Sequence, residues 1–191
     1  MTQVVLLHSA LGLTQHVLDW AEALREDGHT VVTPDLFGGE VFGDLDAGVE
    51  KVDGEGFASF VAVARGQVAG LDGPRVYAGF SLGGGVAEVL ALQDPQAVGL
   101  VVVTGAVSPA WFDITAWPAG LAAQLHAANG DPWLEPDENA ALVALADGAC
   151  EEFEYSTDGH LFAFEGWHEY DEDASHLLFE RVSDFLAALD K

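Results

Sequence analysis

At residues 79–83 the chain reads Gly-Phe-Ser-Leu-Gly, which is a Gly-x-Ser-x-Gly pattern. Residues 75–78 before it, Arg-Val-Tyr-Ala, are typical of a short buried strand, and residues 84–92 after it are typical of a helix. A Gly-x-Ser-x-Gly sequence between a strand and a helix describes a nucleophile elbow, a sharp turn that holds its serine in a strained backbone conformation. We therefore expect Ser81 at the open end of a sheet, above the positive end of the following helix.

The two glycines of the pattern are expected where a side chain has no room. A Cβ atom at position 79 or 83 would collide with the neighbouring strand or helix in so tight a turn. The pattern alone arises easily in a chain with 22 glycines among 191 residues, so a plain glycine-rich turn is the competing interpretation. The flanking strand and helix favour the catalytic elbow.

Apolar segments of strand length alternate along the chain with segments of helical period, a pattern typical of a parallel sheet covered on both faces. The length fits one domain, residues 1–191. Residues 38–54 are rich in Gly and Asp and lack periodicity, so we predict a surface loop there. The predicted strands are 3–8, 30–33, 75–78, 98–104, 121–127 and 151–155, and the predicted helices are 15–26, 55–71, 84–92, 136–147 and 175–189.

The charge balance is strongly acidic, since 32 Asp and Glu against 6 Lys and Arg give a net charge of −26. Such a surface repels phosphate groups, so we expect neither a nucleic-acid partner nor an anionic membrane partner. Salt should relieve self-repulsion on this scale. Adaptation to a salty host is one hypothesis for the charge, and a GC-rich genome is the other.

Several further classes are disfavoured by what the sequence lacks. No apolar run reaches membrane-spanning length, and the first residues do not have a signal-peptide pattern. Cys150 is the only cysteine, so no internal disulfide can form and we predict a cytoplasmic protein. No His, Cys and Asp spacing fits a metal site, and no Gly-x-Gly-x-x-Gly follows the first strand. We expect neither a metal nor an organic cofactor.

A serine hydroxyl needs a histidine to remove its proton and an acid to orient that histidine. With this type of elbow the chain order is Ser, then Asp or Glu, then His, each in a loop after a strand. His160 fits, because it follows the strand 151–155 and a turn. The other histidines precede the serine, lie in a strand, or lie in or just before the last helix: His8, His16, His29, His126, His168 and His176.

The orienting acid should follow the strand 121–127. Asp131 lies in the turn that leaves this strand, so it is the favoured candidate, although Asp is also common in turns for local reasons. Asp137 and Asp158 remain alternatives.

Two backbone N–H groups should stabilise the negative oxygen that forms during attack on a carbonyl group. The first is the amide of Leu82, the residue after the nucleophile. The second is expected in the loop 8–12 after the first strand, where Ala10 is the best-placed donor. The predicted substrate pocket comprises Ser9, Trp111, Phe112, Trp133 and Phe164, with ordinary core packing as the alternative for each aromatic residue.

With these residues assembled, the chain resembles the dienelactone hydrolase family of α/β-hydrolases over nearly its whole length. The resemblance implies an α/β-hydrolase fold, that is, a doubly wound and mostly parallel sheet, here minimal and without a cap domain. It also implies cleavage of an ester, for which Ser81, His160 and Asp131 of this chain would form a Ser-His-Asp triad. The similar segments are 7–13, 32–37, 79–84, 130–131, 159–162, 170–171 and 179–181.

The sequence departs from that family at three positions. Members that act on dienelactones carry a cysteine nucleophile and a glutamate in the oxyanion loop, where this chain has Ser81 and Ser9. Phe164 stands in place of an arginine that holds the substrate carboxylate in the family. We therefore expect a serine hydrolase that cleaves a small, neutral carboxylic ester, thioester or lactone through an acyl-enzyme. A non-catalytic binding protein on the same scaffold and an acyltransferase are the alternatives.

Overall fold

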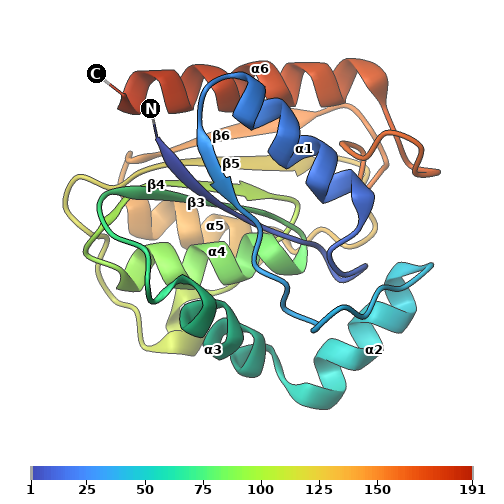
Figure 1. Ribbon diagram of the computed structural model, residues 1–191, viewed down its shortest axis with the longest axis horizontal. Coiled ribbons are helices and arrows are strands. Elements are labelled where there is room, and N and C mark those ends of the chain that lie inside the picture. The colour runs from blue at the N-terminus through green and yellow to red at the C-terminus, as the bar shows by residue number, and fades with distance from the viewer. Residues whose placement is uncertain (1, 191) are drawn as a thin grey trace.

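Six parallel strands form one sheet in the order β2-β1-β3-β4-β5-β6. The computed structural model describes residues 2–190 and is shown in Figure 1. The sheet order changes direction between β1 and β3, so the carboxyl ends of the central strands border a crevice. The strands are β1 Gln3–Leu7, β2 Thr30–Val32, β3 Arg75–Phe80, β4 Ala97–Val103, β5 Ala122–Ala128 and β6 Cys150–Tyr155.

Helices cover both faces of the sheet (Figure 1). On one face lie α1, Gln15–Glu26, and α6, Glu172–Leu189. On the other face lie α3, Phe57–Val68, α4, Leu82–Gln93, and α5, Pro136–Ala146. The remaining helix, α2, spans Leu45–Glu55 and lies beyond the carboxyl ends of the strands. Within residues 2–190, no segment forms a separate cap domain over these ends.

The central strand β3 shows why the sheet requires two helical layers. All six of its residues are buried. Because side chains alternate along a strand, Val76, Ala78 and Phe80 pack toward α1 and α6, whereas Tyr77 packs toward α3 and α4. A strand that is apolar on both faces is stable only between two apolar layers.

Apart from one region, each predicted strand is a strand and each predicted helix is a helix, and their ends differ from the prediction by at most three residues. Residues 38–54 were predicted to be a loop, but α2 occupies 45–55, so that prediction is wrong for most of the segment. The Asp44 side chain caps α2 by accepting a hydrogen bond from the Ala47 N–H at 2.9 Å. Gly56, with φ of 81°, then separates α2 from α3, which divides the predicted helix 55–71.

None of the helices within residues 2–190 is both long enough and apolar enough to cross a membrane.

Candidate active site

Ser81 lies in the tight turn between β3 and α4 and has φ of 54° and ψ of −121°. A positive φ is unfavourable for a residue with a side chain, so the surrounding structure must hold it there. The Ser81 N–H donates to the Val103 carbonyl at 2.8 Å, and the Ser81 carbonyl accepts from the Gly84 N–H at 2.8 Å. These bonds fix the strained turn to β4 on one side and to the first turn of α4 on the other.

The glycines on either side of Ser81 are required for space, as predicted. A Cβ atom on Gly79 would overlap the backbone of Gly83, and one on Gly83 would overlap the carbonyl of Leu7 in β1. A third glycine, Gly105 after β4, was not singled out from the sequence. A Cβ atom there would overlap the Ser81 backbone, so the elbow needs a bare backbone on this side too.

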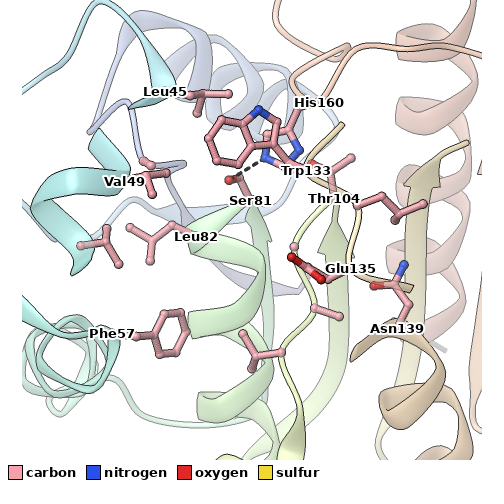
Figure 2. Close-up of a pocket in the computed structure, with 16 residues that line it drawn as sticks. Leu45, Val49, Phe57, Ser81, Leu82, Thr104, Trp133, Glu135, Asn139 and His160 are labelled. Atoms are coloured by element: carbon pink, nitrogen blue, oxygen red, sulfur yellow. Dashed lines mark hydrogen bonds between the residues drawn. The ribbon is translucent and has the colours of Figure 1, made fainter. Parts of the chain in front are cut away.

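Three side chains from separate loops form a continuous hydrogen-bonded row. His160 Nε2 lies 2.8 Å from Ser81 Oγ, and His160 Nδ1 lies 2.7 Å from Asp131 Oδ2. A carboxylate can only accept, so Nδ1 carries the proton and Nε2 accepts the bond from the serine hydroxyl. Figure 2 shows the bond between Ser81 and His160. This tautomer is the one that a base acting on Ser81 requires.

Burial isolates the acid end of this row. The Asp131 side chain is fully buried and that of His160 is 6% exposed. The second oxygen of Asp131, Oδ1, accepts a hydrogen bond from the Trp133 N–H at 2.8 Å. In the described part of the chain His160 bonds to Asp131, and neither alternative acid, Asp137 or Asp158, contacts it in this way.

A cavity of about 250 Å³ opens beside Ser81 and His160. On one side it is bounded by apolar side chains of α2 and α3, namely Leu45, Val49, Val52 and Phe57. On the other side lie Trp133, Leu134, Glu135 and Asn139, from the start of α5 and the loop before it. Figure 2 shows Ser81 and His160 between these two walls.

The two amides expected to stabilise a negative oxygen both belong to residues that line this cavity. Leu82 is the first residue of α4, where backbone N–H groups have no partner within the helix. Ala10 is 2% exposed and lies in the loop after β1. Within residues 2–190, neither amide donates a hydrogen bond to another residue. Neither N–H group is therefore occupied by a protein acceptor.

Among the predicted pocket residues, only Trp133 is found in the lining. Phe164 is fully buried and packs against Phe80 with ring centroids 4.9 Å apart, so it belongs to the core and not to the pocket. Ser9 is also fully buried, and its hydroxyl accepts a hydrogen bond from the Leu11 N–H at 3.2 Å. These two predictions are wrong, because both side chains turn inward from loops that border the site.

The predictions for Trp111 and Phe112 are wrong as well. Both lie in or next to the short 3₁₀ helix Pro109–Phe112. Trp111 is 66% exposed and lies outside the cavity lining. Phe112 packs against Phe57 at 5.7 Å between ring centroids, so it supports a cavity residue from behind and does not reach the cavity.

The apolar wall from α2 was not predicted. Its residues Leu45, Val49 and Val52 are spaced at four and three positions, which is the spacing of one helical face. That signal could have identified α2, but Gly48 and the acidic residues between these positions obscured it. On the other wall, Glu135 and Asn139 carried no sequence signal that pointed to the cavity.

A buried acid lies directly behind the cavity. Glu88 of α4 is fully buried, and its Oε2 accepts a hydrogen bond from the Val107 N–H at 2.9 Å. Burial raises the pKa of Glu88 to about 8, although the Val107 N–H acts in the opposite direction. Val107 lines the cavity, so a neutral Glu88 holds part of the cavity wall in position.

Over residues 2–190, no group of three or more His, Cys, Asp or Glu side chains is arranged to hold a metal ion.

Comparison with known proteins gives a consistent result. The dienelactone hydrolase family model matches residues 1–189. No curated protein matches the sequence. A Klebsiella pneumoniae protein assigned as a dienelactone hydrolase has a TM-score of 0.80 and 19% identity, covering 98% of this chain and 87% of that one. A dienelactone hydrolase-like promiscuous phosphotriesterase from metagenomic libraries has a TM-score of 0.78 and 18% identity, covering 99% and 87%.

A third similar structure belongs to a protein whose name includes the α/β-hydrolase fold. The mouse α/β-hydrolase domain-containing protein 10 has a TM-score of 0.72 and 12% identity, covering 98% of this chain and 90% of that one. At such low identities these likenesses show the fold alone. They confirm the expected α/β-hydrolase fold.

Proposed function

Because the chain belongs to the dienelactone hydrolase family and is a hydrolase, we propose that it cleaves small carboxylic esters with Ser81 as its nucleophile. The observation that carries this proposal is the row of hydrogen bonds from Ser81 through His160 to Asp131, at 2.8 and 2.7 Å, beside a cavity. An activated serine of this kind is the usual requirement for acyl transfer.

In the first step the Ser81 oxygen attacks the ester carbonyl carbon, and the hydroxyl proton passes to His160 Nε2. Asp131 keeps the imidazole oriented and stabilises the positive charge that it gains. The carbonyl oxygen becomes negative and accepts hydrogen bonds from the Leu82 and Ala10 amides. The free N–H groups of these two residues in the cavity lining support that role.

In the second step the tetrahedral intermediate collapses, and the bond to the alcohol oxygen breaks. His160 gives its proton to the departing alcohol, which leaves the acyl group attached to Ser81. Water then enters and loses a proton to His160 as it attacks the acyl carbon. The Ser81 oxygen departs and recovers that proton, which releases the acid and restores the enzyme.

The cavity walls support a small, uncharged acyl group. The wall formed by Leu45, Val49, Val52 and Phe57 is apolar, and no Lys or Arg side chain of the described residues lines the cavity. A carboxylate on the acyl group would therefore lose its hydration without gaining a positive partner. Thioesters and lactones with the same acyl properties would fit the same chemistry.

The test compares wild type with Ser81→Ala on p-nitrophenyl acetate and butyrate. We expect kcat/KM to fall at least about 10³-fold, because the rest of the site retains only weak catalysis without the nucleophile. Equal rates would contradict the proposal and favour a binding protein on the same scaffold. Product analysis with added alcohol distinguishes hydrolysis from acyl transfer, since a transferase would form a new ester.

A further inference from the structure

The two walls of the cavity contact different halves of a bound ester. His160 must protonate the departing alcohol, so the alcohol half has to lie on the His160 side of Ser81. The Trp133 indole lies over Ser81 and His160, and Glu135 and Asn139 lie on the side of Ser81 away from the apolar wall of α2 (Figure 2). The residues near Trp133 therefore determine which alcohol is accepted.

This alcohol-side wall contains the only acidic side chain in the described cavity lining. Glu135 is solvent-exposed and precedes α5, yet its side chain makes no capping hydrogen bond to that helix. Figure 2 shows its carboxylate among the lining side chains, on the same side of Ser81 as Asn139. No Lys or Arg of residues 2–190 shares the cavity with it, so a bound substrate meets this negative charge directly.

Trp133 adds an aromatic surface to the same wall. Its indole ring is 6.2 Å from the His160 ring between centroids, and the residue is 39% exposed. The backbone N–H of Trp133 donates a hydrogen bond to Asp131 Oδ1, which fixes the Trp133 backbone to the acid that orients His160. Aromatic faces attract cations, and tryptophan does so most strongly.

The charge of the whole molecule acts in the same direction. A net charge of −26 attracts positively charged molecules to the protein and repels negatively charged ones. The local carboxylate, the indole face and the overall field all favour a cation at the alcohol side of the cavity.

We propose that the alcohol half of the substrate carries an alkylammonium group, which binds between the Trp133 indole and the Glu135 carboxylate. This inference rests on the proposed esterase function. The sequence analysis expects a neutral substrate, and this inference changes that expectation for the alcohol half only. The acyl half is still expected to be neutral, because it faces the apolar wall.

The experiment uses two thioesters of nearly equal shape, acetylthiocholine and S-(3,3-dimethylbutyl) thioacetate. Acetylthiocholine carries a positively charged nitrogen at the position where the other ester has a neutral carbon. For wild type, we expect kcat/KM for the charged ester to exceed that for the neutral one by about 10-fold at low salt. In Glu135→Gln the ratio should fall about 3-fold. Trp133→Leu should also lower it.

The matched control is Glu180→Gln, which removes the same charge from an exposed position on α6, on the other face of the sheet. This variant should keep the wild-type ratio, which separates the local effect from the overall field. Hydrolysis of both thioesters at equal rates would overturn the inference and leave the esterase function standing. An equal fall of the ratio in both Gln variants would overturn the role of Glu135. Failure to hydrolyse any ester would overturn the esterase function together with the inference.

Discussion

Gly48 of α2 lies so close to Ala10 that a Cβ atom at position 48 would overlap the Ala10 carbonyl oxygen. The helix that forms the apolar wall therefore rests on the loop that carries one of the two proposed oxyanion donors. This contact links the shape of the cavity to the position of the Ala10 amide, and it explains a glycine inside a helix, where glycine is normally unfavourable.

Gly48→Ala should lower esterase kcat/KM about 10-fold or more, because the added methyl group must displace either α2 or the Ala10 loop. Gly54→Ala is the matched control, since it lies in the same helix and a Cβ atom there meets open space. That variant should keep full activity and gain about 0.5–1 kcal/mol in the free energy of unfolding. Equal activity of the two variants would show that the contact with Ala10 does not affect the site.

Asp131→Asn should reduce kcat by about 10³–10⁴-fold while leaving the fold intact, because an amide no longer selects the His160 tautomer that accepts from Ser81. Steady-state kinetics on a p-nitrophenyl ester measure this loss. Asp137→Asn is the control, since Asp137 is exposed in the first turn of α5. If Asp137→Asn proved the more damaging change, the assignment of the orienting acid would be wrong.

Glu88→Gln should flatten the pH dependence of stability. The pKa of Glu88 is raised from 4.5 to about 8, so between these values the folded state holds a proton that the unfolded state has lost. Wild type is therefore stabilised at low pH and loses that contribution as pH rises through about 8, roughly 5 kcal/mol in total. Gln keeps an acceptor for the Val107 N–H and does not titrate.

Urea unfolding of both proteins at about pH 5 and about pH 8 measures the difference. The expected result is that wild type loses more stability than Glu88→Gln across this interval. Parallel losses would mean that Glu88 is charged in the folded protein at neutral pH.

Salt should stabilise the protein, because a net charge of −26 produces strong self-repulsion that ions screen. We expect Tm to rise by at least about 4 °C between about 0.05 M and about 1 M NaCl, which corresponds to roughly 1–2 kcal/mol. Thermal unfolding followed by circular dichroism measures this change. A Tm that is independent of salt would refute the hypothesis of a salt-adapted host.

The turn around Ser81 and its candidate partners could be predicted from the sequence, because the signals for them are a local motif and the order of residues along the chain. Gly79 and Gly83 mark a turn whose geometry excludes side chains, and chain order with strand ends was sufficient to select His160 and Asp131. The structure brings these three loops together at one edge of the sheet, as parallel strands require.

The residues that shape the cavity were mostly missed, for two physical reasons. Gly48 makes α2 look like a loop in sequence, and only its contact with the Ala10 loop explains the glycine. Phe164 follows His160 closely, but the turn that presents His160 to the cavity directs Phe164 into the core against Phe80. Which way a side chain faces in an irregular loop depends on tertiary packing, and sequence periodicity does not report it.

The most direct measurement of the central claim is covalent labelling with a fluorophosphonate, followed by mass spectrometry of the digested protein. An activated serine attacks this reagent, whereas unactivated hydroxyls do not. The account predicts one modified peptide, with the label on Ser81, and no labelling of Ser81→Ala. A label on any other residue, or an unlabelled protein that still hydrolyses esters, would contradict it.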